Sequence, residues 1–247
     1  MPAVDKPLPW QGEQWARLLQ QFEAGQLPHA LLLAGPEHTG KGQFALALAR
    51  LLLCRSPVRG LNCGSCHSCE LSGSGGHGDF RWLEPGDKSR VIKVDQVRAA
   101  IDFAVKTAGF GQRKVMVFDP ADALNVNAAN ALLKCLEEPG AGTHILLVCH
   151  RPHSVPATIR SRCQMLRFPL PSAEQGLDWL QAEVGDAGLA GQLLELAEGA
   201  PLRAATLFRE ESAAELVNLH KGLDALCRGQ LVAAEMPALL GELALDE

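Results

Sequence analysis

The segment "GPEHTGKG", residues 35–42, lies between an apolar run and a helix-forming run. Gly35, Gly40 and Lys41 have the spacing of a phosphate-binding loop, in which backbone N–H groups face phosphate oxygens and the lysine approaches the terminal phosphates. The preceding "HALLLAG" predicts a buried strand, and the following "KGQFALALARLLLC", rich in Ala and Leu, predicts a helix. This strand–loop–helix context favours a phosphate loop over a glycine-rich turn that binds nothing.

Two features that magnesium-dependent hydrolysis requires are missing. The residue after Lys41 normally supplies a hydroxyl to magnesium, but here it is Gly42, and Thr39 lies before the turn. The run "KVMVFDP" predicts a buried strand ending at Asp119, the place of an acid that orients magnesium, although Asp119 could also be a helix N-cap. The next residue, where some ATPases carry the carboxylate that activates water, is Pro120. Both losses argue against ATP hydrolysis and leave open whether the loop binds ATP and Mg²⁺.

Four of the eight cysteines lie within residues 54–69 with the spacing C-x8-C-x2-C-x2-C. They are Cys54, Cys63, Cys66 and Cys69. Four thiolates complete a tetrahedral zinc site with no open position, and the polar insertion at residues 55–78 has too few apolar residues to order itself. The sequence therefore predicts structural zinc. His67 and His77 lie near enough to replace a cysteine, but a histidine on a polar loop is more often simply solvated. The other cysteines lie in apolar segments and predict buried thiols: Cys135, Cys149, Cys163 and Cys227.

Strand-like and helix-like segments alternate through the first two thirds of the chain. Further strands are predicted for "DFRWLEP", "THILLVCH" and "CQMLRFPLP", and helices for "VDQVRAAIDFAVKTA" and "NAANALLKCLEEPG". In the first helix, Val94, Val97, Ile101 and Val105 share one face. This alternation predicts an α/β fold, a mostly parallel sheet with helices on both faces, over residues 1–168. Only helical segments follow, forming a small lid at residues 169–210 and the start of another helical domain at residues 211–247. Ser172 and Gln175 form a capping-box pattern at the first of these helices.

Composition narrows the class of protein. The chain has 247 residues, 47% of them hydrophobic, but its apolar runs are too short for a membrane span. The N-terminus has no signal pattern, so we expect a soluble, cytoplasmic protein whose cysteines are thiols or metal ligands. A net charge of −5 does not favour a protein that binds nucleic acid on its own.

Two arginines in "ATIRSRCQ", Arg160 and Arg162, follow a predicted short helix and precede a strand at the edge of the sheet. Spacing alone supports two interpretations equally. The arginines either form surface ion pairs, or one of them reaches the nucleotide of a neighbouring subunit and neutralises charge on the transferring phosphoryl group.

Several segments together resemble the clamp-loader subunits of bacterial DNA polymerase III, which belong to the AAA+ class of P-loop proteins. They are "NAANALLKCLEEP", "SRC" at residues 161–163 and the four-cysteine insertion after the loop helix. "LPHALLLAGP", "IKVDQVR" and "PLRAATLF" extend the similarity from the N-terminus to about residue 210. The combination is far more specific than any single motif.

The resemblance implies an AAA+ domain, a lid and a helical collar, of which residues 211–247 would be only the first helices, so that the chain is a fragment. Relatives that hydrolyse ATP carry GKT and Asp-Glu-Ala where this chain has GKG and Asp-Pro. It is therefore most similar to the stator, which lacks hydrolysis and keeps an arginine finger. The resemblance then implies that Arg162 enters the ATP site of an adjacent motor subunit, that zinc binds the four cysteines, and that Arg203 is the lid arginine that senses nucleotide.

The implied partners are the motor (gamma/tau) and delta subunits and, through the complex, the sliding clamp and primed DNA of the polymerase holoenzyme. Two alternatives stay open. One is an active clamp-loader ATPase whose magnesium is held by water in place of a threonine. The other is a zinc-knuckle nucleic-acid-binding module. The negative net charge of the chain and the small number of aromatic residues near the cysteines argue against it.

Overall fold

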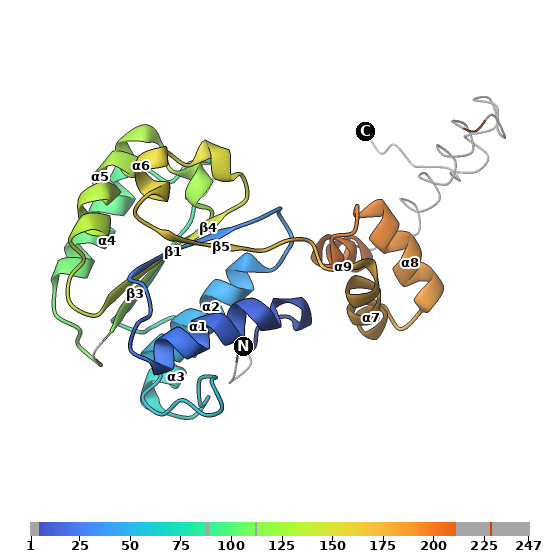
Figure 1. Ribbon diagram of the computed structural model, residues 1–247, viewed down its shortest axis with the longest axis horizontal. Helices are drawn as coiled ribbons and strands as arrows, with labels where there is room; N and C mark the ends of the chain where they lie inside the picture. The colour runs from blue at the N-terminus through green and yellow to red at the C-terminus, as the bar shows by residue number, and fades with distance from the viewer. Residues whose placement is uncertain (1–4, 87–88, 112, 211–227, 229–247) are drawn as a thin grey trace, which may run out of the picture. The chain divides into compact units, whose positions relative to one another are not determined.

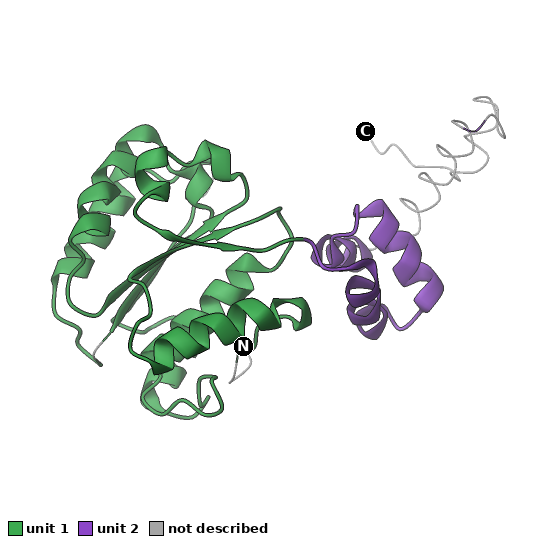
Figure 2. Ribbon diagram, in the orientation of Figure 1, with its two compact units in different colours: residues 1–169 green, residues 170–247 purple. Residues whose placement is uncertain are grey.

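The computed structural model describes residues 5–86, 89–111, 113–210 and 228. The chain divides into two compact units, residues 1–169 and 170–247 (Figure 2). The predicted collar segment, residues 211–247, lies outside the described residues except for Arg228.

The first unit contains a five-stranded parallel sheet (Figure 1). Its strands are β1 (Ala30–Ala34), β2 (Phe80–Leu83), β3 (Lys114–Phe118), β4 (Thr143–Cys149) and β5 (Gln164–Arg167). Their order is β2-β3-β4-β1-β5, and every pair of neighbours is parallel. Both β1 and β3 are buried along their whole length, which agrees with the apolar sequence of β1 and of β3 after Lys114.

Helices cover both faces of this sheet (Figure 1). On one face lie α1 (Gly12–Glu23), α2 (Lys41–Leu53) and α3 (His67–Ser74), and on the other lie α4 (Val94–Val105), α5 (Val126–Glu137) and α6 (Ala157–Arg160). Short 3-10 turns occur at η1 (Pro9–Gln11), η2 (Ala121–Ala123) and η3 (Pro152–Ser154). In β1, Leu31 and Leu33 pack into the core beneath α1 and α2, whereas Leu32 packs into the core beneath α4 and α5. The predicted α/β class is confirmed.

Some local expectations differ from the structure. Neither α1 nor α3 was predicted from the sequence. The sequence of α3, HSCELSGS, is polar. The helix predicted from Val94, Val97, Ile101 and Val105 is present, but this apolar face is not buried along its whole length, because Val105 is 76% exposed. The buried face of α4 is centred on Val97, Ala100 and Ala104. Each four-residue step from Val97 turns about 40° around the helix, so two steps bring Val105 to the solvent.

The second unit begins with α7 (Ala173–Val184), α8 (Ala187–Leu196) and α9 (Pro201–Arg209). The predicted capping box is present, since the Ser172 hydroxyl accepts from the Gln175 amide at 3.2 Å and the Gln175 side chain accepts from the Ser172 amide at 3.3 Å. Leu180, Leu193 and Ala204 lie in the core of this unit. Among the residues that the structure describes, no helix combines the length and apolar character that a membrane crossing requires.

Candidate functional site

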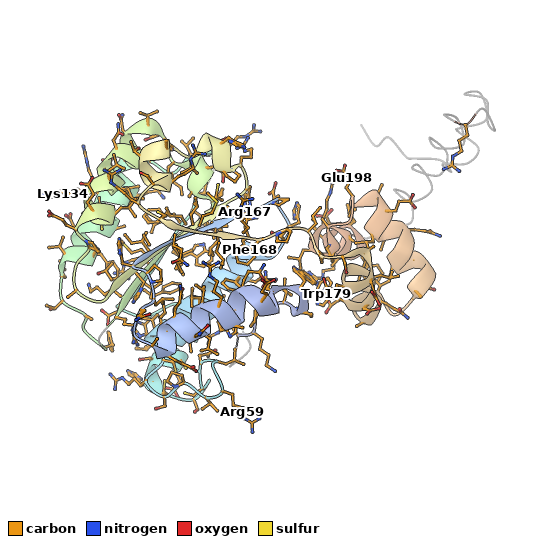
Figure 3. All side chains as sticks on the ribbon, in the orientation of Figure 1. Arg59, Lys134, Arg167, Phe168, Trp179 and Glu198 are labelled. Carbon is orange, nitrogen blue, oxygen red and sulfur yellow. The ribbon has the colours of Figure 1, made fainter. Side chains whose placement is uncertain are left out.

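The loop between β1 and α2 has the backbone shape that its glycines allow. Gly40 has a φ of 81°, a left-handed conformation, and is the N-cap of α2. At Gly35 a Cβ would lie only 2.0 Å from the carbonyl oxygen of Phe168, the residue labelled beside β5 in Figure 3. The Phe168 ring packs edge-on against Phe44 of α2 at 4.8 Å. Gly35 is therefore required for packing, whether or not the loop meets a phosphate.

Lys41, the loop lysine, is buried and bonds to its own loop. Its Nζ donates to the carbonyl oxygen of Pro36 and to the Thr39 hydroxyl, the latter at 3.2 Å. The Thr39 hydroxyl donates to the same Pro36 carbonyl at 3.0 Å. From the N-terminal segment, Gln11 and Trp10 donate to the Thr39 carbonyl oxygen at 3.0 Å and 3.2 Å. The Lys41 ammonium, which in a phosphate loop approaches the terminal phosphates, is thus hydrogen-bonded to oxygens of the loop itself.

Asp119, at the end of β3, lies close to the beginning of α2. A Cβ built on Gly42 would be 2.7 Å from Asp119 Oδ2, so the carboxylate takes the place where a hydroxyl-bearing side chain would start. Burial lowers the pKa of Lys41 to about 8, although the negative charge of Asp119 acts in the opposite direction. Burial likewise raises the pKa of Asp119 to about 6, against the effect of Lys41. Burial thus disfavours the charged form of both side chains.

The acids beyond β3 have structural roles. Asp122, whose side chain is 2% exposed, accepts from the His150 amide at 2.8 Å and from Arg151 Nε at 3.3 Å. It therefore links the end of β3 to the end of β4. The N-cap interpretation of Asp119 is wrong, because Asn125 caps α5 by accepting from the Ala128 amide at 2.8 Å.

The four clustered cysteines converge, with all their Sγ atoms within 4.8 Å of one another. Cys54 follows the last residue of α2, Cys66 is the N-cap of α3, and Cys69 lies within α3. The Sγ–Sγ distances are 3.9 Å for Cys54–Cys66 and 3.8 Å for Cys63–Cys69. A tetrahedron of thiolates around zinc has sulfur–sulfur edges of about 3.8 Å, because each Zn–S bond is about 2.3 Å. The cysteine geometry fits a metal ion.

Backbone amides support this thiol cluster. The Cys63 amide donates to Cys54 Sγ and the Cys66 amide to Cys63 Sγ, both at 3.3 Å. Hydrogen bonds from Ser65 and Cys66 lower the pKa of the Cys63 thiol to about 6. Neither alternative histidine joins the cluster: His67 is 59% exposed beside Glu70, and His77 Nδ1 accepts from the Asp79 amide.

The cysteines outside the cluster that the structure describes agree broadly with the predicted buried thiols. Cys135 and Cys149 are buried and Cys163 is partly buried. Burial raises the pKa of the Cys149 and Cys163 thiols to about 12, so both stay protonated at neutral pH. Cys227 lies outside the described residues.

The two candidate arginines have different surroundings. Arg160 donates to the Pro152 carbonyl at 3.4 Å and lines a hollow beside Gly35 and Pro36. Arg162 lies between α6 and β5, is 35% exposed, and pairs with Glu137, the last residue of α5.

No sequence pattern predicted a role for Glu137, which lies within "CLEEPG" at the end of a predicted helix. In the second unit, Arg203 of α9 is 47% exposed and lies 4.0 Å from Glu198.

Comparison with known proteins places this arrangement in a class. A DNA polymerase III gamma subunit-related protein from Thermotoga maritima has a similar structure, with a TM-score of 0.57 and 20% identity over 92% of this chain and 76% of that chain. The Thermotoga maritima RuvB branch migration motor is similar with a TM-score of 0.52 and 14% identity, over 92–93% of this chain and 67% of that one. The fold is the AAA+ fold of clamp-loader-like proteins.

The sequence matches are more specific. Residues 10–172 match the family described as "DNA polymerase III, delta subunit". The chain is 40% identical to DNA polymerase III subunit delta' of Pseudomonas aeruginosa over 92% of its own length and 69% of that protein. It is 36% identical to the Escherichia coli subunit delta' over 83% of its length and 61% of that protein. The chain belongs to the DNA polymerase III delta' family.

Proposed function

We propose that this chain is a stator subunit of the clamp loader, which does not hydrolyse ATP itself and donates Arg162 to the ATP site of an adjacent motor subunit. In this role it supports ATP-driven loading of the sliding clamp onto primed DNA. The observation that carries the proposal is a contrast between two basic residues. Lys41 is buried and bonded to its own loop, whereas the Arg162 side chain is partly exposed and held by a carboxylate.

The absence of hydrolysis is supported by four features of the loop and of the end of β3 beside it. Position 42 has no side chain, and the nearby Asp119 carboxylate carries a raised pKa, which weakens it as a magnesium ligand at mildly acidic pH. Pro120 has no acid to activate water. Lys41 would have to break two internal contacts before it could reach a phosphate. These features disfavour the alternative of an active ATPase.

The choice of Arg162 over Arg160 is supported by their contacts. Arg160 lies beside the chain's own loop, next to Gly35 and Pro36. Arg162 is fixed by groups from the end of α5 and from α6. An arginine finger acts on a nucleotide held by another subunit, so it must be presented at the surface.

The second part of the proposal is structural zinc at Cys54, Cys63, Cys66 and Cys69. Their spacing fits a closed thiolate tetrahedron, which leaves no position for a substrate. When bound, the ion would crosslink the end of α2 to α3 and order the insertion between them.

We further propose residues 169–210 as a lid whose Arg203 senses nucleotide, and partnership with the motor (gamma/tau) and delta subunits. The division of the chain into units at residues 169 and 170, and the exposure of Arg203, support the lid assignment.

The experiment combines binding and reconstitution. Isothermal titration of the isolated chain with Mg-ATP should show no micromolar binding, and a phosphate-release assay should show no turnover. The chain should co-purify with motor and delta subunits and raise the ATPase rate of the complex. Micromolar binding with clear turnover by the isolated chain would instead support the active ATPase. Salt-sensitive DNA binding by the lone chain, lost on chelation, would support the nucleic-acid module.

A further inference from the structure

We infer that Glu137 is a positioning residue that holds the Arg162 guanidinium in the orientation needed to meet a neighbouring subunit's phosphate. This inference rests on the proposed finger role of Arg162. It adds a residue from α5, 25 positions earlier in the chain, to the element that acts in trans.

The guanidinium is held on two sides. Glu137 Oε1 accepts from Arg162 Nε at 2.8 Å and lies 2.5 Å from Nη2. On the other side, Nη1 donates to the Thr158 carbonyl at 2.8 Å and contacts the Ser161 hydroxyl at 3.4 Å. The carboxylate comes from the end of α5 and the carbonyl from α6, so two helices fix one side chain.

A count of donors shows what this arrangement leaves available. An arginine has five N–H donors: one on Nε and two on each terminal nitrogen. Glu137 accepts the Nε donor, and the Thr158 carbonyl accepts one Nη1 donor, while Nη2 is in ion-pair contact with the same Glu137 oxygen. At least one donor then remains on each terminal nitrogen, the second Nη1 donor having only the long contact to Ser161. Two donors on neighbouring nitrogens form the fork that binds phosphate oxygens in a bidentate manner.

The Arg162–Glu137 pair contributes more to the orientation of the guanidinium than to the stability of the fold. Arg162 is 35% exposed and Glu137 49% exposed, and such surface pairs contribute little to folding free energy. A free arginine side chain samples many rotamers, and ordering it on contact with a nucleotide costs free energy. A side chain already fixed in the isolated subunit avoids that cost in the transition state, where misplacement by about 1 Å can slow a reaction about a hundredfold.

The test is single-turnover ATP hydrolysis by the reconstituted complex. Glu137→Ala should slow the site that receives Arg162 by about tenfold, leaving its ATP affinity unchanged, because orientation affects the transition state more than the ground state. Glu137→Gln keeps an acceptor oxygen and should retain most of the rate. Glu138→Ala is the matched control: Glu138 is the next residue, is also exposed, and forms no ion pair among the described residues. It should leave the rate unchanged.

A double variant separates a positioning role from a general structural one. If Glu137 acts through Arg162, then Glu137→Ala should have no further effect in an Arg162→Ala background. A normal rate for Glu137→Ala, or an additive loss in the double variant, would overturn this inference. If Arg162→Ala itself leaves hydrolysis unchanged, the proposed finger role fails. Co-purification of each variant with the motor subunits checks assembly, and Glu137→Ser, which also removes the carboxylate, serves as the test if Glu137→Ala does not assemble.

Discussion

The carboxylate of Asp119 lies where a side chain at position 42 would begin, since a Cβ on Gly42 would be 2.7 Å from Asp119 Oδ2. The missing hydroxyl and the position of the acid are therefore features of one packing arrangement. Beside them, Lys41 and Thr39 both bond to the Pro36 carbonyl. The polar side chains of this glycine-rich loop therefore satisfy one another.

The contact between positions 42 and 119 should appear as energetic coupling. In the wild-type chain, Gly42→Ala should lower the free energy of unfolding by about 1 kcal/mol, because the new methyl group displaces the carboxylate. In an Asp119→Ala background the same change should raise it by about 0.5–1 kcal/mol, since alanine is the better helix former. Urea unfolding of the four proteins measures both values. Equal effects in the two backgrounds would show that the residues are not coupled.

The burial of Lys41 predicts a pH dependence of stability. Its pKa is lowered from 10.5 to about 8 in the folded chain, so between these values the unfolded state binds more protons. Stability from this group therefore rises as the pH increases from about 8 to 10.5. Lys41→Met removes this titrating group. The free energy of unfolding of the wild type should therefore rise relative to that of the variant over that pH range. A constant difference between pH 7.5 and 10, measured by urea unfolding, would contradict the assigned burial effect.

Zinc content tests the thiol cluster. The purified chain should contain one zinc ion by native mass spectrometry, and Cys63→Ser should lose it. Cys163→Ala, which removes a thiol outside the cluster, should retain the ion. Chelation should speed amide hydrogen exchange in α3, because this helix has few apolar residues to hold it without the metal. Unchanged exchange after complete metal removal would mean that packing alone orders the insertion.

Arg50 connects α2 to the N-terminal segment and to the insertion. It is 2% exposed, pairs with Asp5, and donates to the Cys69 carbonyl at 3.4 Å. Arg50→Met leaves Asp5 without this partner and should lower the free energy of unfolding by about 3 kcal/mol. Arg98→Ala removes a solvent-exposed pair with Asp95 and should change it by less than about 0.5 kcal/mol. If urea unfolding gives similarly small losses in the free energy of unfolding for both variants, the buried Arg50 pair does not stabilise the fold more than an exposed pair does.

Local patterns predicted the sheet because its central strands contain apolar runs, ALLLA in β1 and VMVF in β3. The cysteine cluster was also predictable, since Cys63, Cys66 and Cys69 are each separated by two residues and Cys54 directly follows the preceding helix. In contrast, α3 could not be predicted because its polar sequence has no apolar periodicity. Its position depends on packing against α2, which is a tertiary contact.

Contacts between distant residues could not be read from the sequence. The pairing of Arg162 with Glu137 joins residues 25 positions apart on different helices. The bond from Gln11 to the Thr39 carbonyl joins residues 28 positions apart. The sequence shows which residues a phosphate loop lacks, but only packing shows that its lysine is bonded to Pro36.

The donation of Arg162 in trans is tested most directly by single-turnover ATP hydrolysis in a reconstituted complex carrying Arg162→Ala, with Arg98→Ala as the control for loss of an exposed arginine. We predict that assembly and ATP binding are kept, while hydrolysis at the receiving site slows by about a thousandfold, the scale known for arginine fingers. We also expect Arg162→Lys to recover little, because lysine lacks the fork of donors. Hydrolysis at the wild-type rate in a fully assembled Arg162→Ala complex would contradict it.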